Sequence, residues 1–113
     1  MKNHQTLAKH ILDAIGQIEQ YTHEVSKDDF LINFMIQDAV VRKLEIIGEA
    51  SRHISPHIKE KFTDIPWRDI NAMRNKLVHE YFNVDAETVW NVVKLDLADL
   101  KNYAERILKL DIN

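Results

Sequence analysis

Apolar residues recur at three- and four-residue steps along most of the chain, which is the pattern of helices with one buried face. The longest predicted helix, the second in chain order, runs from about residue 27 to residue 53. Its apolar positions cover two faces, as expected for the central helix of a bundle or for a helix at a dimer interface. The first helix is predicted from about residue 3 to residue 25, with an apolar face formed by Leu7, Ile11, Ala14, Ile15, Ile18, Tyr21 and Val25.

Local signals support the second helix and predict what packs against it. Ser26 followed by Asp29 resembles a capping box, which satisfies free backbone N–H groups of the first turn. Gly48 lies within the helix, where glycine costs about 1 kcal/mol relative to alanine. We therefore expect another helix to approach closely at Gly48.

Three further helices are predicted in the second half of the chain. Ser55-Pro56 supplies an N-cap and a first helical residue for a short helix that ends near residue 62. Pro66 opens the next helix, and Asp85 is a favourable N-cap for the last one. The sequence thus predicts an all-α fold, an antiparallel helical bundle of four main helices plus one short helix, in a single domain over residues 1–113.

The composition agrees with a globular helical protein and excludes several kinds of chemistry. Of the 113 residues, 45% are hydrophobic and 29% are charged, and 2 Gly and 2 Pro are too few for a many-turned β-sandwich. Cys is absent, which excludes disulfides, thiolate metal sites and Cys nucleophiles. The polar N-terminus and the lack of an apolar run of about 20 residues predict a cytoplasmic protein without a membrane span.

The formal net charge of -3 limits the kind of nucleic-acid contact to expect. A protein that coats nucleic acid through charge alone is usually basic. We therefore expect no broad basic surface, although a compact site for one or two phosphates is compatible with this charge. An acidic body also suits a basic protein partner.

The segment from Arg74 to Tyr81 contains the strongest candidates for chemistry. Arg74, Asn75, His79 and Tyr81 place a guanidinium, an amide, an imidazole and a phenol close together in the sequence. At ~100° per residue, Asn75 and His79 share one helix face, whereas Arg74 and His79 are ~140° apart. Either the Arg74 side chain reaches round the helix, or the helix ends near His79, or a second subunit completes the site.

These residue types fit the attack of an RNA 2′-hydroxyl on its neighbouring phosphate. An imidazole transfers protons near neutral pH because a His side chain has an unperturbed pKa near ~6.5. Arg74 would stabilise the developing phosphorane charge, and Asn75 would orient the imidazole or hold a phosphate oxygen. This chemistry needs no metal and no cofactor. By periodicity alone, the simpler interpretation is that Arg74 is a surface cation and His79 a helix C-terminal residue favoured by the dipole.

Other polar and aromatic residues have simpler expected roles. Glu49 and His53 lie four residues apart on the second helix and are predicted to form a surface ion pair, since no third metal ligand is evident. Alternatively, Glu49 faces a dimer cleft, where it helps to position His79 or binds a partner. Trp67 and Trp90 are predicted to be core anchors rather than platforms for stacking bases.

Nearly the whole chain resembles the HepT family of HEPN-domain toxins. The segment 44–50, Leu-Glu-Ile-Ile-Gly-Glu-Ala, is similar to the family's second-helix pattern. In the last predicted helix, Leu97-Ala98 departs from the Leu-Pro pair that is often found at the same place in the family. The family motif is an Arg, then four residues, a His, one residue and a Tyr, and Arg74, His79 and Tyr81 satisfy it. The flanking segments match as well and make the resemblance more specific: Ile65-Pro66-Trp67-Arg68-Asp69-Ile70, Val84-Asp85 and Val89-Trp90.

The resemblance implies a HEPN-like fold and a metal-independent endoribonuclease that acts on cellular RNA. It implies a homodimer in which Arg74 and His79 of both subunits line a shared cleft. It also implies a toxin–antitoxin pair of a type II/VII-like kind. The antitoxin would be a minimal nucleotidyltransferase (MNT) that transfers AMP from ATP onto Tyr81 and so blocks the phosphate site beside Arg74 and His79.

Two other functions remain open at this point. The chain could be a non-catalytic helical module that binds a partner nucleotidyltransferase and presents Tyr81 to it as a substrate. It could also be a nucleotide-binding dimeric bundle, although no Gly-rich phosphate loop is present to support that interpretation.

Overall fold

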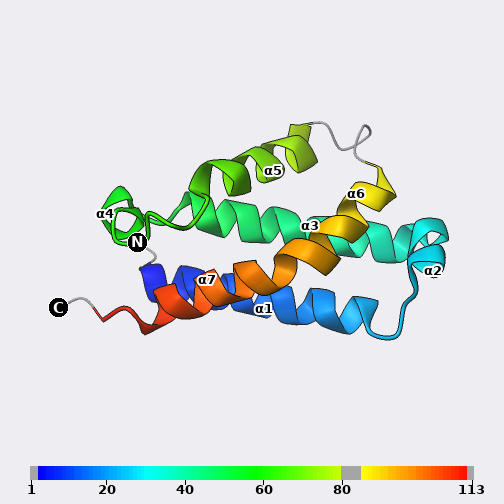
Figure 1. Cartoon of the computed structure of the whole chain (residues 1–113), viewed down its shortest axis with the longest axis horizontal. Coiled ribbons are helices and arrows are strands. Elements are labelled where there is room, and N and C mark those ends of the chain that lie inside the picture. The colour runs from blue at the N-terminus through cyan, green and yellow to red at the C-terminus, as the bar shows by residue number, and fades with distance from the viewer. Residues whose placement is uncertain (1–2, 80–84, 112–113) are drawn as a thin grey trace.

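The computed structural model describes residues 3–79 and 85–111, and every regular element in these ranges is a helix (Figure 1). None of the described helices combines the length and the apolarity that crossing a bilayer requires. The elements, in chain order, are α1 (His4–Thr22), α2 (Lys27–Ile32), α3 (Phe34–Arg52), α4 (Pro56–Lys59), α5 (Trp67–His79), α6 (Ala86–Asn91), the π-helical segment η2 (Val92–Asp96) and α7 (Leu97–Lys109).

The core lies between the long helices, which run lengthwise through an elongated molecule of 48 × 27 × 25 Å (Figure 1). Helix α1 packs against both α3 and α7, and α5 packs against α3. The buried residues of α1 recur at the predicted three- and four-residue steps. The predicted all-α bundle is confirmed, because nearly all of the most completely buried large side chains come from several different helices. They are Ile15, Ile18, Phe30, Val40, Leu44, Ile47 and Ile107, together with Ile54 between α3 and α4.

Three predicted helix starts are confirmed by their capping hydrogen bonds. The side chain of Ser26 accepts a hydrogen bond from the backbone N–H of Asp29, at 3.1 Å. Ser55 caps α4 with Pro56 as its first residue, and Asp85 accepts from the N–H of Thr88 at 2.7 Å. These starts depend on residues within one turn, which explains why the sequence alone predicts them.

The prediction of one continuous helix from residue 27 to residue 53 is wrong. Asn33 has an extended backbone (φ -103°, ψ 91°), and its side chain accepts from the N–H of Ile36, so α2 ends and α3 begins there. The break turns Ile32, Phe34 and Met35 outward, with exposed fractions of 76%, 73% and 81%. These apolar residues therefore lie outside the core of this chain.

Three other helix boundaries also differ from the prediction. Helix α1 ends at Thr22 rather than near residue 25. The short helix expected to reach residue 62 ends at Lys59. A single last helix was predicted after Asp85, but it consists of α6 and α7 joined by a π-helical turn, whose hydrogen bonds span one residue more than those of an α-helix. Periodicity did not reveal this turn, because apolar residues remain on the inner face through it.

The two tryptophans differ in their surroundings. Trp90 is 9% exposed and packs on the ring of Phe30, with the ring centroids 5.2 Å apart, which confirms it as a core anchor. Trp67 is half-buried at the start of α5, and its ring N–H donates to the backbone carbonyl of Phe62 at 3.0 Å. The hydrogen bond from Trp67 fixes the start of α5 to the preceding loop.

The contact between α3 and α5 depends on the absence of a side chain at Gly48, as the sequence suggested. A Cβ atom at residue 48 would overlap the Cβ of Arg74 and lie 3.3 Å from its Cα. Real Cβ atoms do not overlap in this way, so α5 approaches α3 as closely as it does only because residue 48 is glycine. Gly16, in α1, has no such contact, since nothing lies within 4 Å of the place that a Cβ would occupy there.

We predict opposite effects of the same substitution at the two glycines. Gly48→Ala should destabilise the protein by about 1–3 kcal/mol, because the added methyl group forces α5 away from α3. Gly16→Ala should stabilise it by about 0.5–1 kcal/mol through helix propensity alone. Urea unfolding of both variants measures the two changes. A neutral or stabilising Gly48→Ala would show that α5 does not approach α3 as described.

Candidate functional site

Helix α5 carries three of the predicted site residues and ends at one of them. Arg74 and Asn75 lie in its C-terminal half, and His79 is its last residue. Arg74 faces α3, and its side chain is only 18% exposed. Tyr81, the fourth predicted residue of this segment, lies outside the described residues. Of the two predicted catalytic residues, Arg74 is therefore packed against α3, whereas His79 is exposed at the end of α5.

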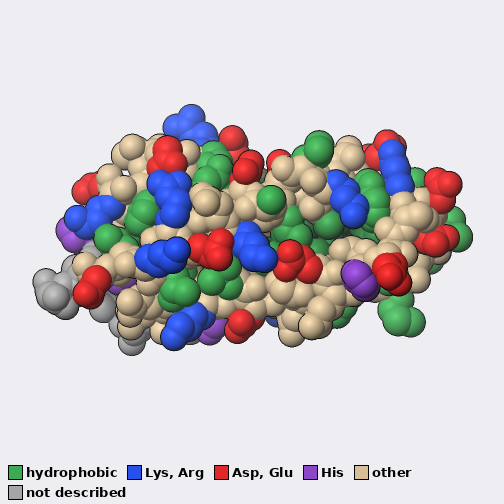
Figure 2. Space-filling model, turned by 60° about the horizontal axis from the view of Figure 1, so that its bottom comes forward, with side chains coloured by type: hydrophobic (Ala, Val, Ile, Leu, Met, Phe, Trp, Pro, Cys, Tyr) green, Lys and Arg blue, Asp and Glu red, His purple; other side chains and the backbone are tan. Residues whose placement is uncertain are grey.

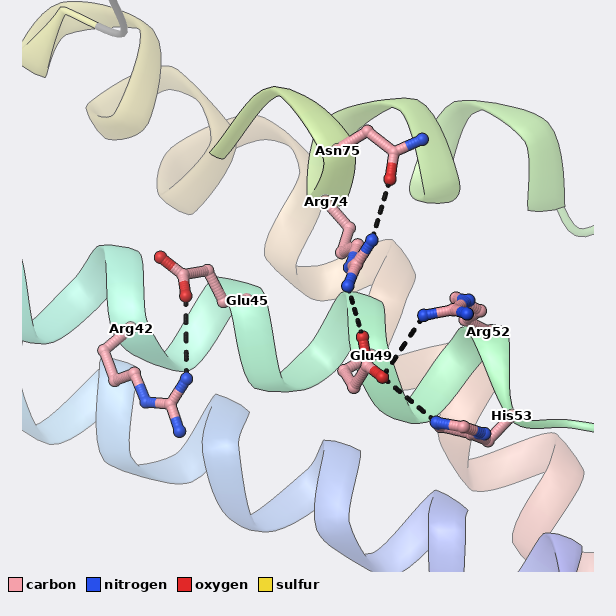
Figure 3. Close-up of polar contacts among 7 residues, drawn as sticks. All are labelled: Arg42, Glu45, Glu49, Arg52, His53, Arg74 and Asn75. Atoms are coloured by element: carbon pink, nitrogen blue, oxygen red, sulfur yellow. Dashed lines mark hydrogen bonds and ion pairs between the residues drawn. The ribbon is translucent and has the colours of Figure 1, made fainter. Parts of the chain in front are cut away.

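Arg74 is held by two oxygen atoms from different helices (Figure 3). Its Nη2 lies 2.8 Å from Oε2 of Glu49 on α3, and its Nη1 donates to the side-chain oxygen of Asn75 at 2.9 Å. The remaining Nε–H is buried and has no hydrogen-bond partner among the described residues. The guanidinium is thus oriented by protein contacts before any ligand binds, while its buried Nε–H has no partner in the described part of the chain.

Glu49 is the centre of a small charged cluster on α3 (Figure 3). Its Oε1 lies 3.0 Å from Nε2 of His53 and 3.4 Å from Nη1 of Arg52, while Oε2 contacts Arg74. Partial burial by itself raises the pKa of Glu49. The hydrogen bond with His53 and the positive charges of Arg74 and Arg52 together lower this pKa by more than burial raises it, so the net pKa lies below the ordinary value. Glu49 is therefore an anion at neutral pH.

A hollow of about 400 Å³ runs along α3 beside this cluster. Arg74 and Val78, four residues apart on one face of α5, form part of its wall. His79 does not line it. The lining combines cationic, anionic and apolar side chains from three helices: Leu7, Arg42, Glu45, Ile46, Glu49, Ala50, His53, Arg74 and Val78.

The structure brings together some of the predicted residues and separates others. The ion pair of Glu49 with His53 is confirmed, and among the residues described no group of three or more potential ligands is placed to hold a metal ion. Glu49 contacts Arg74 rather than His79, and Asn75 likewise binds Arg74 rather than the imidazole. Within one chain, Arg74 and His79 point to different surroundings.

Sequence reasoning missed two parts of this site. It did not identify Arg52 as a further cation on Glu49, or Arg42 in the wall of the hollow. Arg42 pairs with Glu45 at 3.6 Å, one turn before Glu49 on the same helix (Figure 3). The signal was present, since residues 42, 45, 49 and 52 follow helical spacing, but the partner on α5 is not visible from spacing alone.

One face of the molecule agrees with the expectation that the protein has no broad basic surface. On the face drawn in Figure 2, Lys and Arg side chains are interspersed with Asp and Glu side chains and form no broad basic area. Phosphate contacts on this face would therefore depend on a few placed cations rather than on a charged surface.

An all-α bundle that presents Arg74 and His79 five residues apart on one helix has the features of the HEPN class. A family model described as ribonuclease HepT-like matches residues 11–107, and the chain belongs to this family. No solved structure matches the chain.

The curated relatives include archaeal proteins of similar length. "Probable ribonuclease HepT" from Thermococcus cleftensis is 43% identical over 108 residues, covering 96% of this chain and 98% of the relative. A "Putative RNase" from Methanocaldococcus jannaschii is 40% identical over 95 residues, covering 84% and 87%. A "Gamma-glutamylcyclotransferase and putative RNase" from the same organism is 45% identical over 101 residues, but the chain matches only 44% of its length.

We predict that Glu49 stabilises the fold in a pH-dependent way. Because the folded-state pKa is lowered, its contacts stabilise the protein above the unfolded-state value of ~4.3 and are lost as pH falls through the folded-state value. Glu49→Gln should lower the free energy of unfolding by no more than ~1 kcal/mol at pH 7, since the side chain is partly exposed, and by less at pH 3.

Urea unfolding at the two pH values measures this difference. Glu45→Gln is the matched control, because it removes the same charge from the same helix but only a 3.6 Å pair with Arg42. A larger loss for Glu49→Gln at pH 3 than at pH 7 would contradict the assignment.

Proposed function

We propose that this protein is a metal-independent endoribonuclease toxin that cleaves cellular RNA in the cytoplasm. The observation that carries the proposal is the partly buried guanidinium of Arg74, fixed between Glu49 and Asn75 at the edge of a hollow. A cation fixed in advance stabilises a developing phosphorane charge without reorganisation during the reaction. Membership of the ribonuclease HepT-like family supports RNA as the substrate.

In the proposed reaction, the 2′-oxygen of a ribose attacks the adjacent phosphorus. The O2′–P bond forms as the P–O5′ bond breaks, and the products carry a 2′,3′-cyclic phosphate and a 5′-hydroxyl. The imidazole of His79 accepts the proton of the 2′-hydroxyl as the 2′-oxygen attacks, and the imidazolium so formed returns that proton to the leaving 5′-oxygen. Arg74 binds the non-bridging phosphate oxygens, and Asn75 and Glu49 position its guanidinium.

Two copies of the chain are needed to place these groups at one phosphate. Arg74 lines the hollow, whereas His79 projects elsewhere from the end of the same helix. Val78, beside Arg74, is 41% exposed. On α3, Met35, Arg42 and Glu49 lie seven residues apart and share one face, which we call the α3 stripe. A homodimer formed across this stripe would cover exposed apolar surface and bring one subunit's His79 towards the other's Arg74.

The proposed regulation acts on Tyr81, two residues after His79. A nucleotidyltransferase antitoxin would bind the dimer and ATP, and the Tyr81 oxygen would attack the α-phosphorus, forming a new O–P bond and releasing pyrophosphate. The attached AMP would place an anion where the RNA phosphate binds.

We predict that incubation with such an enzyme and ATP adds the mass of one AMP group per chain to wild type and none to Tyr81→Phe. Equal labelling of both proteins would exclude Tyr81 as the modified residue.

The separation of Arg74 and His79 within one chain favours a second candidate function. A non-catalytic module that binds a nucleotidyltransferase and presents Tyr81 would have no need for the two groups to meet. Such a module would bind its partner without cleaving RNA, so a cleavage assay distinguishes the two functions.

We predict that the purified protein cleaves total cellular RNA in the presence of EDTA. His79→Ala should fold normally, because the side chain is exposed, and should lose activity by about 10²–10⁴-fold. Arg74→Lys keeps the charge but loses the planar fork, and should also lose most of the activity. His57→Ala, at an exposed histidine outside the hollow, is the matched control and should cleave like wild type.

The assay has clear contrary outcomes. If folded His79→Ala cleaved RNA as fast as wild type, the catalytic assignment would be wrong. If folded and unmodified wild type showed no cleavage, the presenting module would be the better function.

A further inference from the structure

A second hollow lies between α5 and the C-terminal helices and shares no lining residue with the hollow beside Arg74. Its volume is about 270 Å³. It exists because α5 packs chiefly against α3 and leaves a gap towards η2 and α7. We call it the acidic groove, and define it by its apolar floor of Ile70, Met73 and Leu100 and its carboxylates of Asp69, Asp96 and Asp99.

The carboxylates of the acidic groove have no cationic side-chain partner among the described residues. Asp69, Asp96 and Asp99 are exposed, and none of them forms an ion pair with another described residue. No Lys, Arg or His is among the residues that line the groove. Other surface carboxylates do have a cation within reach, such as Asp64, which accepts two hydrogen bonds from Arg106. The acidic groove therefore combines apolar surface with three carboxylates that no described cationic side chain pairs with.

The size and charge of the acidic groove exclude several classes of ligand. RNA and anionic lipids carry phosphates, which three carboxylates repel. The carboxylates do not converge as a metal site, since no such cluster occurs among the described residues. A volume of about 270 Å³ falls below the ~300–1,000 Å³ typical of small-molecule sites, but it accommodates one or two side chains of a protein.

We infer that the acidic groove binds a Lys or Arg side chain presented by a different protein. The aliphatic part of such a side chain packs on Ile70, Met73 and Leu100, and its charged end reaches the carboxylates at the rim. Basic anchor residues in partly apolar pockets are common energetic centres of protein interfaces. The wall of the groove also includes Val92 and Asp96, the two ends of η2, and π-helical turns occur frequently at functional sites.

The experiment uses a fluorescent, end-capped helical peptide with Ala and Leu positions and one face of Arg residues. A second peptide carries citrulline in place of each Arg, which keeps the shape and removes the charge. The groove variant is Asp69→Asn with Asp96→Asn and Asp99→Asn. The control variant, Asp13→Asn with Asp28→Asn and Glu105→Gln, has the same net charge and alters exposed carboxylates elsewhere. Fluorescence polarisation gives the affinity of each protein for each peptide.

We expect the Arg peptide to bind wild type and the control variant equally, and to bind the groove variant about tenfold or more weakly. The citrulline peptide should bind all three proteins weakly. Equal weakening in both variants, or no binding of the Arg peptide to wild type, would overturn the inference.

Two further arms identify other occupants of the groove. If spermidine bound wild type with the same dependence on the groove carboxylates and the peptide did not bind, the occupant would be a small polyamine rather than a protein. If the groove variant changed the oligomeric state in analytical ultracentrifugation, the occupant would be a second copy of this chain. Either result would overturn the assignment to a different protein, and neither depends on whether the protein cleaves RNA.

Discussion

The position of α5 against α3 is the constraint on which the candidate site depends. Gly48 removes the side chain that would otherwise hold the two helices apart, and the Cβ of Arg74 occupies the space this leaves. The next residue of α3, Glu49, then reaches the guanidinium at 2.8 Å. One close helix contact therefore both places Arg74 and supplies the anion that orients it.

This arrangement has a cost that a single chain does not remove. A guanidinium paired with Glu49 and Asn75 is well oriented, but its Nε–H is buried without a partner among the described residues. His79 leaves the same helix ~140° away from Arg74 and contributes nothing to the hollow beside it. The chemistry proposed for the pair would therefore need the second subunit of the proposed homodimer. Val78, in the wall of the hollow, is 41% exposed and would be covered in the proposed homodimer.

The parts of the fold that the sequence predicts well are those fixed within one helical turn. The starts at Ser26, Ser55 and Asp85 depend on local hydrogen bonds, and the buried face of α1 depends on local periodicity. The break at Asn33 was missed because apolar residues continue on both sides of it, so the pattern alone resembles one helix.

The candidate site was predictable as a set of residues but not as an arrangement. The motif on α5 identified Arg74 and His79, and helical spacing indicated the pair of Glu49 with His53. The contact of Glu49 with Arg74 joins residues 25 positions apart in the sequence, and only the packing of α3 on α5 establishes it. Likewise, Gly48 signalled a close approach without indicating which residue would lie against it.

The most direct test of this account is a mixture of two inactive variants. His79→Ala and Arg74→Lys are purified separately, mixed, allowed to exchange subunits, and assayed on RNA in EDTA. If Arg74 of one subunit works with His79 of the other, each mixed dimer has one intact site, and up to about a quarter of wild-type activity returns on statistical exchange. If mixed dimers form, as shown by native mass spectrometry, and no activity returns, the two groups do not meet across subunits and the central claim is contradicted.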